Sequence, residues 1–505
     1  MLRRAAALTT VLGALLAFSA RAAVPPIPIP SVGLPPSPTF QGAPATSAPI
    51  RGLPPIPHNP FMAPNGKSEI HDDGWQSDSS AWAGPLGRSP HVGSSFIFRD
   101  CGSITFDSRG RVVSVCIGLT GPQLYMFDPT TLATLATFSL PLRQGLPGNF
   151  FQDFTGGGYF YLDNHDRVIA GTTTRHIYVI AEDPGSPGFT LEHDYDLSSV
   201  LNSSEKITSA LPDSHGLLWF VARNDGVVGT IDLASGNVRA IHLGSGAVGE
   251  IENSFATDMR GGVYIATNRK LYRFGVGANG VPKVVWQVTY PNSFEHKPGQ
   301  VDDGTGTTPT VMAGGYVNIT DNADPMHVVV YRTAPRPHRF VRRHHHRRSI
   351  KLSRRVCEVP IFARGQSADE NSLISVGRSM IAEDNFGYSS PTSLAGKVTT
   401  PGFARVDINR NGRGCHAVWT NTSVAAPTAV SKLAIANGLL YTYTTDPAGN
   451  WYWTALDFRT GRMVYKAYAG SGPFYNNNYA GIAISPTGTE YLGTLGGIVS
   501  VRDGS

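Results

Sequence analysis

Carboxylate and amide side chains stand at both ends of one short stretch, ENSLISVGRSMIAEDNFGY. It begins with Glu370 and Asn371, continues through apolar residues to a Gly-Arg pair, and closes with Glu383, Asp384 and Asn385. A two-residue turn at the Gly-Arg pair would form a hairpin in which Asn371 lies opposite Asp384 and Glu370 lies opposite Asn385. Oxygen atoms of these types bind hard cations such as Ca²⁺, or hold a polar ligand through hydrogen bonds.

The same residue types recur where other apolar strands are expected to begin or end. They are Asn224, Asp225, Glu250, Glu252, Asn253, Asp321, Asn322, Asp324, Asn476, Asn477 and Asn478. If the strands surround a common axis, these side chains and those of the hairpin converge on one face as a ligand-binding site. The acids Glu252, Asp321 and Glu383 are then the candidate metal ligands, and Ca²⁺ is the candidate cofactor. The alternative is that Asp and Asn only cap turns at strand ends.

The composition predicts the elements that must position these residues. Charged residues make up only 16% of the 505, whereas there are 56 glycines and 37 prolines. This balance favours short strands joined by tight turns over long helices. The sequence therefore predicts an all-β protein.

Internal repeats make the prediction specific. Units of an apolar strand, a turn rich in Asp, Gly or Asn, and a second strand begin near residues 103, 159, 208, 254, 308, 372, 430 and 480. Most continue into a third and a fourth strand, as in a β-propeller of eight four-stranded blades. A seven-bladed ring is the alternative, because the unit after residue 308 is interrupted. The last unit has three recognisable strands, and residues 92–100 are expected to supply its fourth and close the ring.

The outer strands carry a family resemblance. WYWTALDFRTGRMVYKAYAG and VVGTIDLASGNVRAIHLG resemble the pyrroloquinoline-quinone (PQQ) type propeller repeat, in which a Thr-Gly pair closes the turn between the outer strands. Tyr465 stands where that repeat has Trp, and Thr131 with Leu132 replaces Thr-Gly in the first unit. The resemblance covers most of residues 100–503 and implies the propeller fold.

Three kinds of relative supply functional precedents. Quinoprotein dehydrogenases hold a quinone over Ca²⁺ at the centre of such a ring. This chain has neither adjacent cysteines nor a Cys-x-x-Cys-His haem site, which argues against a bound PQQ. Lactonase and esterase propellers use a calcium ion as Lewis acid, and assembly scaffolds of this repeat family bind protein partners without catalysis. We expect a binding protein or scaffold first, and a metal- or quinone-dependent dehydrogenase or hydrolase as the alternative.

The N-terminus predicts export. Residues 1–22 have a basic start, an apolar run and a small-x-small cleavage pattern, as in a signal peptide, although a retained anchor is the alternative. No later stretch is long and apolar enough to span a bilayer. We therefore expect a secreted or periplasmic protein, as a monomer. Residues 23–60 are crowded with proline and are expected to be an extended linker that joins no sheet, leaving residues 61–505 as the propeller.

The four cysteines are an even number, as expected in an exported chain. A turn at residues 107–110 places Phe106 opposite Arg111, and this register places Cys101 opposite Cys116, which predicts a disulfide. A second bridge between Cys357 and Cys415 is left open.

A basic insertion at residues 334–355 interrupts the fifth unit. Together with Arg332 it holds ten Lys or Arg and no acid. This positive charge is larger than the formal net charge of +5 of the whole chain, so the remaining residues carry a net negative charge. Disorder in solvent is the simpler interpretation. The alternative is that Arg342, Arg343, Arg347 and Arg348 attach the protein to an anionic surface.

Two further motifs have weaker interpretations. His71, Asp72 and Asp73 in HDDGWQSD have the types to bind a cation, but a solvated turn explains them as well. Asp213, Ser214 and His215 have the composition of a catalytic triad, but neighbours in one turn cannot take triad geometry.

Overall fold

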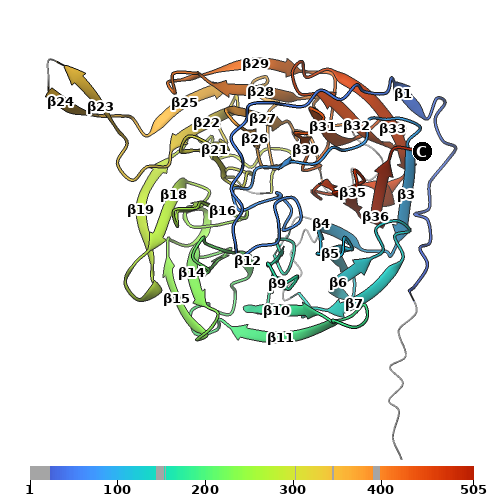
Figure 1. Ribbon diagram of the computed structural model, residues 1–505, viewed down its shortest axis with the longest axis horizontal. Coiled ribbons are helices and arrows are strands. Elements are labelled where there is room, and N and C mark those ends of the chain that lie inside the picture. Colours follow the sequence, from blue (N-terminus) through green and yellow to red (C-terminus); the bar gives the residue numbers. More distant parts are fainter. Residues whose placement is uncertain are drawn as a thin grey trace, which may run out of the picture.

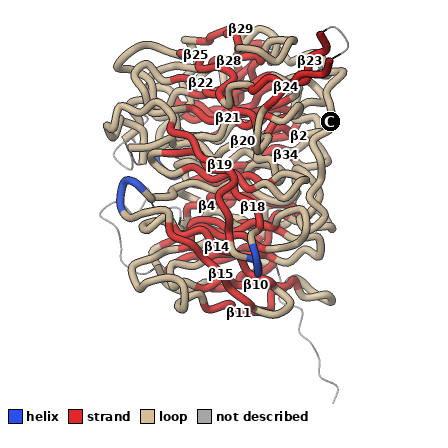
Figure 2. Tube along the Cα trace, turned by 90° about the vertical axis from the view of Figure 1, so that its left-hand side faces the viewer, coloured by secondary structure: helices blue, strands red, loops and turns tan. Residues whose placement is uncertain are grey.

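The protein is a ring of eight β-sheets, an eight-bladed β-propeller, in a computed structural model (Figure 1). The structure describes residues 23–143, 153, 155–301, 303–343, 346–389 and 398–504. The signal peptide predicted at residues 1–22 lies outside them. Seen from the side, strands alternate with loops and turns throughout the molecule, and the helical segments are short turns (Figure 2). These turns are η2 (Gly246–Val248), η3 (Ala278–Gly280) and η5 (Pro473–Tyr475).

Each of the first four blades is a four-stranded antiparallel meander running outward from the axis. Their strands are β4 (Asp100–Phe106), β5 (Val112–Gly118), β6 (Gly121–Phe127) and β7 (Thr134–Ser139); β8 (Tyr161–Leu162), β9 (Val168–Gly171), β10 (His176–Glu182) and β11 (Phe189–Asp196); β12 (Ile207–Pro212), β13 (Leu218–Ala222), β14 (Val227–Asp232) and β15 (Asn237–His242); β16 (Ala256–Thr257), β17 (Val263–Ala266), β18 (Lys270–Val276) and β19 (Pro282–Thr289).

The other four blades are built alike, with two additions. Their strands are β20 (Thr310–Met312), β21 (Tyr316–Thr320), β22 (His327–Arg332) and β25 (Arg355–Pro360); β26 (Ile374–Val376), β27 (Ser379–Glu383), β28 (Phe403–Ile408) and β29 (Cys415–Asn421); β30 (Lys432–Ala434), β31 (Leu439–Thr445), β32 (Asn450–Asp457) and β33 (Met463–Ser471); β34 (Ala483–Ile484), β35 (Glu490–Thr494), β36 (Gly497–Arg502) and β3 (His91–Phe96). The additions are β1 (Phe40–Gly42) outside β33 and β2 (Ser79–Ser80) beside β30.

An aspartate turn joins the two inner strands of each of the first four blades. In each turn the carboxylate accepts a hydrogen bond from the backbone N–H four residues later, at distances of 2.7 to 3.3 Å. The aspartates are Asp107, Asp163, Asp213 and Asp258. This local bond explains why the repeat is visible in the sequence, since Asp stabilises a turn through its own side chain.

The eighth blade closes the ring, as the sequence predicts. Strand β3 comes from the N-terminal side and pairs with β36 from His91 opposite Arg502 to Phe96 opposite Gly497. Next to it, the backbone of Gly493 approaches the carbonyl of Cys101 so closely that a Cβ there would lie 1.5 Å from the oxygen. Chain ends that are far apart in sequence are thus joined by main-chain bonds and by close packing between blades.

Apolar side chains fill the space between neighbouring blades. Trp219 of the third blade is fully buried and packs against Phe274 of the fourth, with ring centroids 6.3 Å apart. The indole N–H of Trp219 donates to the turn carboxylate of Asp213 at 3.0 Å, so the turn and the core stabilise each other. Burial of such side chains supplies most of the driving force for folding.

The expectation that the proline-rich segment joins no sheet is wrong for Phe40–Gly42. This strand, β1, pairs with β33, and the Phe40 ring stacks on Tyr465 at 5.7 Å. Val24 forms a bridge with Thr134, and Ile29 is buried. Prolines prevent a central strand, but residues between them can still pair with an exposed edge, because an edge strand needs bonds on one side only.

Residues 59–80, which we call the central plug, cross the middle of the ring (Figure 1). Backbone N–H groups of Phe106, Leu162, Thr257, Val311, Ser375 and Leu433, all on innermost strands, donate to plug carbonyls at 2.7 to 3.1 Å. Asn59 donates to the carbonyl of Pro212 on a further inner strand. The plug therefore bonds with the innermost strands of seven blades.

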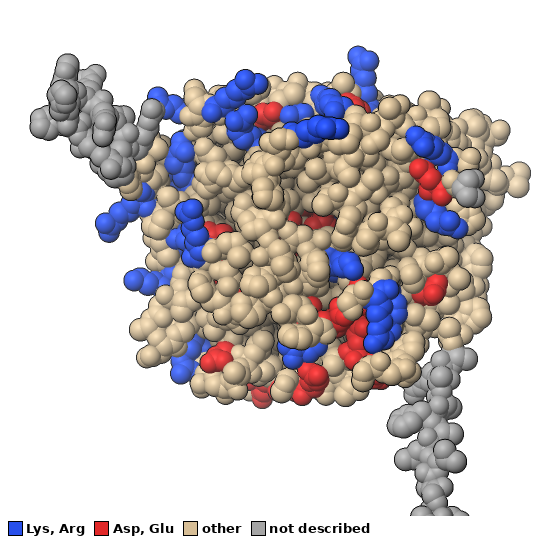
Figure 3. All heavy atoms as spheres, in the orientation of Figure 1, with Lys and Arg blue, Asp and Glu red and all other residues tan. Residues whose placement is uncertain are grey.

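On the face drawn in Figure 3, Lys and Arg lie mainly around the rim rather than at the middle.

The basic insertion forms a hairpin of β23 (His338–Arg343) and β24 (His346–Lys351), so the interpretation that it is disordered is wrong. It projects from the ring beyond β22 and β25 (Figure 1). Arg342 lies opposite Arg347, and Val341 lies opposite Arg348. The hairpin is a separate two-stranded sheet, which explains why it interrupts a blade without altering the blade's order.

Both disulfides are present. Cys101 and Cys116 are bonded across β4 and β5, as predicted, and Cys357 and Cys415 join the outer strands β25 and β29 of neighbouring blades. The predicted register near the first bridge was wrong by one residue, since Phe106 lies opposite Val112. A bulge between Cys101 and Ile104 restores the pairing of the two cysteines.

Candidate functional site

The hairpin of β26 and β27 has the expected register. Val376 lies opposite Ser379 and Ile374 opposite Ile381. Beyond the strands, the backbone N–H of Glu370 donates to Asn385 Oδ1 at 2.8 Å. The polar ends of the hairpin therefore meet on one rim of the ring, at the start of the innermost strand.

Glu383 is the centre of a buried hydrogen-bond network at this rim. Its Oε1 accepts from the amides of Asn371 at 2.9 Å and Asn385 at 3.0 Å, and its Oε2 accepts from the Ser431 hydroxyl at 2.6 Å. Burial raises the pKa of Glu383 well above its usual value, and these hydrogen bonds act in the opposite direction. The network joins the sixth blade to the seventh, so Glu383, Asn371 and Asn385 have a structural role.

Asp321 is likewise engaged within its own blade. One oxygen accepts from the backbone N–H groups of Ala323 and His327, and the other lies 2.8 Å from His327 Nδ1. Hydrogen bonding to Asp321 raises the pKa of His327. Asn322 next to it donates to the carbonyls of Glu295 and Asp303, each at 2.9 Å. Asn322 thus holds the loop before β20, and Asp321 holds the connection between β21 and β22.

The remaining predicted residues are distributed around the rim. Asp324 accepts from the Gly365 N–H at 2.6 Å, and Asp384 accepts from Ala368 and Phe386, with a pKa that burial raises to about 7. Glu252 lies 3.3 Å from the guanidinium of Arg223, which also bonds with Glu250. Asn477 is fully buried beside Asn478.

The carboxylates of Glu252, Asp321 and Glu383 do not form a shared calcium site in the arrangement that the structure describes. Across the ranges that the structure describes, no group of three or more His, Cys, Asp or Glu is arranged to hold a metal ion. Calcium at Glu252, Asp321 and Glu383 stays a prediction. The oxygens of Asp321 and Glu383 would have to give up protein hydrogen bonds before they could bind an ion.

A small cavity lies on the axis, between the rim and the plug. It measures about 40 Å³, and residues from most of the blades line it, among them Asp100, Asn253, Thr308, Glu370 and Ser372. Ile70 and His71 of the plug also line it. Such a space holds a few waters or a small ion.

Asp100 supplies a carboxylate that the protein does not fully satisfy. Its Oδ2 accepts from Asn478 Nδ2 at 2.8 Å. Its Oδ1 is shielded from solvent, and no hydrogen-bond partner for it lies among the described residues. Burial raises the pKa of Asp100 to about 7, while Asn478 and the charge of Arg143 act to lower it. Asp100 lines the cavity, and its Oδ1 is the oxygen that remains available to a ligand.

Tyr159 shows that the cavity is acidic. Its hydroxyl donates to Asn253 Oδ1 at 3.0 Å. Burial raises its pKa, and the nearby negative charges of Glu252, Glu370 and Glu69 raise it further. A ligand placed beside Tyr159 therefore meets several carboxylates.

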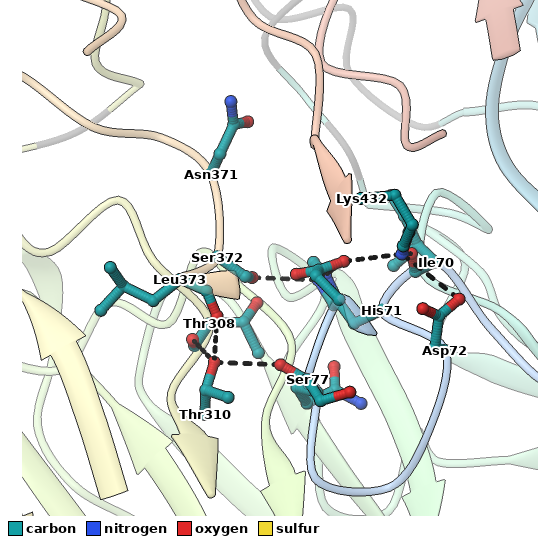
Figure 4. A network of polar contacts seen from close by, with 12 residues as sticks. Ile70, His71, Asp72, Ser77, Thr308, Thr310, Asn371, Ser372, Leu373 and Lys432 are labelled. Carbon is teal, nitrogen blue, oxygen red and sulfur yellow. Dashed lines mark hydrogen bonds and ion pairs between the residues drawn. The ribbon is translucent and has the colours of Figure 1, made fainter. Parts of the chain in front are cut away.

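The plug side of the cavity contains a buried ionic network (Figure 4). His71 Nδ1 lies 3.0 Å from Asp78 Oδ2, and Lys432 Nζ lies 2.8 Å from Asp78 Oδ1 and 3.4 Å from Asp72 Oδ1. Asp73 instead accepts from the Trp75 backbone N–H at 2.8 Å. The acids of HDDGWQSD therefore stabilise the plug and its ion pairs, and do not surround a cation together with His71.

Sequence reasoning missed Asp100 and Tyr159 and gave His71 and Asp78 no place in the site. Asp100 was assigned only to the closing strand, and HDDGWQSD was placed between the proline-rich segment and that strand, with no path across the ring. The available signal was the concentration of His and Asp in HDDGWQSD, but the path of the plug across the ring depends on contacts with distant strands.

Comparisons with known proteins give a limited answer. No family model matches the chain, so membership of the PQQ-like repeat family stays a prediction. An uncharacterized protein of Archaeoglobus fulgidus is 25% identical over an alignment of 366 residues, and the alignment covers 68% of this chain and 69% of that protein. A streptogramin B lyase structure is 10% identical with a TM-score of 0.40, covering 84% of this chain and 99% of its own.

A third likeness is to Chaetomium thermophilum Sqt1 bound to the N-terminus of ribosomal protein L10. It is 14% identical with a TM-score of 0.47 and covers 85% of this chain and 100% of its own.

Proposed function

We propose that this protein is an exported β-propeller binding protein whose central cavity holds a small cation or the cationic end of a small amine. The observation that carries the proposal is Asp100 Oδ1, a solvent-shielded carboxylate oxygen on the cavity wall. A buried ionised carboxylate is costly unless a positive group or hydrogen-bond donors compensate it. An ammonium group would supply both.

The charges around the cavity favour this type of ligand. Glu370 lines the same space as Asp100, and Glu252 and Glu69 are close enough to raise the pKa of Tyr159. Of the nearby cations, Arg223 bonds with Glu250 and Lys432 with Asp78. Arg143, whose charge acts on Asp100, donates to the backbone carbonyls of Asp153 and Thr155. A cationic ligand would add to this partial compensation of the Asp100 charge, whereas an anion would face both Asp100 and Glu370.

Calcium belongs among the ligands to be tested. Asp100, Glu370 and Asn253 offer two carboxylates and an amide around the cavity, which are hard oxygen donors. Ca²⁺ takes six to eight oxygen ligands, whereas ammonium needs only a few acceptors. The small cavity therefore suits a monovalent cation or an alkylammonium group better.

Export is part of the proposal. Two disulfides are typical of proteins that fold in an oxidising compartment. The apolar start of the chain predicts a signal peptide. In the part of the chain with described coordinates, no helix is long and apolar enough to cross a membrane.

Thermal unfolding in the presence of different chloride salts tests the proposal. We expect ammonium, methylammonium or calcium to raise the Tm, because a ligand at 100 times its Kd stabilises the folded state by about 2.7 kcal/mol. Tetramethylammonium at the same ionic strength is the reference salt. Asp100→Asn should abolish the shift, whereas Asp232→Asn, at an exposed surface position, should retain it. The proposal fails if no cation shifts the wild-type Tm, or if Asp100→Asn shifts equally.

A further inference from the structure

Three residues on the plug side of the cavity stand in the order of a nucleophilic triad (Figure 4). The Ser372 hydroxyl lies 3.2 Å from His71 Nε2, although the two residues are 301 positions apart. The other nitrogen of the same imidazole, His71 Nδ1, lies 3.0 Å from Asp78 Oδ2. A serine, a histidine and a carboxylate in hydrogen-bond series are the arrangement by which hydrolases activate a hydroxyl.

Each member is held by a different part of the fold. Ser372 lies two residues before β26, at the inner edge of the sixth blade. His71 and Asp78 come from the plug, where the Asp78 N–H donates to the His71 carbonyl at 3.1 Å. Lys432 of the seventh blade pairs with Asp78 and balances its charge. With Nδ1–H donating to the carboxylate, Nε2 is the acceptor for the serine proton.

Anchoring of the plug does not account for the contact between Ser372 and His71. Six innermost strands already donate backbone hydrogen bonds to the plug, and Lys432 ties its Asp78 and its Ile70 carbonyl to the seventh blade. Ser372 and His71 both line the cavity, so the hydroxyl and the imidazole face the space open to a small ligand.

We propose that Ser372 is a nucleophile, activated by His71 and oriented by Asp78, that accepts a small acyl group from an ester. The Ser372 oxygen bonds to the ester carbonyl carbon while its proton passes to His71 Nε2. The carbon–oxygen bond to the alcohol then breaks, and the alcohol leaves with that proton. Water attacks the acyl-serine by the same route, His71 taking a proton from water and returning it to Ser372, which releases the carboxylic acid.

The cavity restricts the substrate class. Because the axial cavity is small, it favours short acyl groups over long ones. Thr308 of the neighbouring blade also lines the cavity, and its buried hydroxyl is the donor that we assign to the carbonyl oxygen (Figure 4). The preference for a neutral or cationic ester over an anionic one rests on the proposed function, because it depends on Asp100 and Glu370.

Labelling with a small alkyl fluorophosphonate tests the triad directly. This reagent forms a bond from phosphorus to an activated serine oxygen and releases fluoride, so it requires the nucleophile but no cationic ligand. We expect mass spectrometry of the folded protein to find one modification, on the peptide that contains Ser372. Ser372→Ala should abolish it, and His71→Gln should slow it at least 100-fold.

Two controls separate the outcomes. Ser375→Ala removes a buried serine of the same blade whose hydroxyl is hydrogen-bonded to Asn318 rather than to a histidine, and labelling should persist. Thermal unfolding should show that Ser372→Ala remains folded, since it removes one hydroxyl. Asp100→Asn should still be labelled, which distinguishes failure of the cation site from failure of the triad. Absence of labelling at Ser372 in folded wild-type protein, or equal labelling in His71→Gln, overturns the proposal.

Discussion

Lys432 Nζ lies 2.8 Å from Asp78 Oδ1, and neither side chain has any exposed surface. The pair joins an innermost strand of the seventh blade to the central plug. The same lysine donates to the Ile70 carbonyl at 2.8 Å, and the same aspartate holds His71. One buried ion pair therefore fixes the position of the residues that close the central cavity.

Replacing Lys432 by Met should cost about 3 to 5 kcal/mol in the free energy of unfolding, because Asp78 would remain as a buried charge without its partner. Arg355→Met is the matched control, since Arg355 pairs with Glu358 on the surface and is 55% exposed. Loss of that pair should cost less than about 1 kcal/mol. Denaturant titration measures both, and equal small losses would contradict the role assigned to the buried pair.

Gly493→Ala should disrupt the closure of the ring. A Cβ at this position would lie 1.5 Å from the Cys101 carbonyl oxygen, so the eighth blade would have to move away from the first. We expect a loss of about 3 kcal/mol or more in stability. Gly185→Ala is the control, because no atom lies within 4 Å of the Cβ built there. A Gly493→Ala protein with wild-type denaturant midpoint would show that the blades do not pack this closely.

Asp100→Asn should change how stability depends on pH when no ligand is added. The pKa of Asp100 is raised to about 7 in the folded protein, above the value near 4 of an unfolded chain. Its contribution to stability is therefore complete below about pH 4 and is lost as the pH rises through about 7. The asparagine cannot ionise, so the variant should gain roughly 4 kcal/mol relative to wild type between pH 4 and pH 8.

Unfolding free energies at several pH values in a buffer free of ammonium and calcium measure this difference. Asp232→Asn should show no comparable gain with pH. A difference between wild type and Asp100→Asn that stays constant from pH 4 to pH 8 would contradict the raised pKa.

The hairpin of β23 and β24 should bind anionic membranes. Each basic residue near an anionic surface contributes about 1 kcal/mol, so replacing four arginines should weaken partition onto phosphatidylserine vesicles roughly 1,000-fold. The four are Arg342, Arg343, Arg347 and Arg348. Vesicle sedimentation at low and high salt measures the effect. A matched set of exposed arginines should change binding less, and an equal loss would show that only net charge matters; that set is Arg239, Arg260, Arg364 and Arg410.

Local signals made the fold predictable. The turn aspartates hydrogen-bond to a backbone N–H four residues later, so the repeat can be read from a short window. The register of the β26–β27 hairpin also followed from its two-residue turn. The register beside Cys101 did not, because a bulge arises from packing that the sequence does not display.

The site was only partly predictable, because it depends on contacts between distant segments. Asn253 and Glu370 were expected at the centre and line the cavity. Asp321 and Glu383 were expected beside them, but their hydrogen bonds lie within or between blades. Strand ends show which rim a side chain occupies, whereas its rotamer decides whether it faces the axis.

Two sets of serine, histidine and aspartate show the same limit of sequence-based prediction, because residues that are adjacent in sequence need not be aligned in space. Asp213, Ser214 and His215 are adjacent, and the histidine is 73% exposed while Asp213 holds its own turn. The aligned set comes from Ser372, His71 and Asp78, which no short window contains. Proline content was also misleading. It did not reveal that Phe40–Gly42, which precede the plug in the chain, pair with the outer strand β33 of the seventh blade.

The most direct test of the cation site is the anomalous difference map of a crystal soaked in rubidium chloride, since rubidium is close to ammonium in size. Our account predicts a peak inside the axial cavity beside Asp100 Oδ1, and no such peak in crystals of Asp100→Asn. Rubidium peaks confined to the outer surface of the wild-type protein, with the cavity occupied only by water, would contradict it.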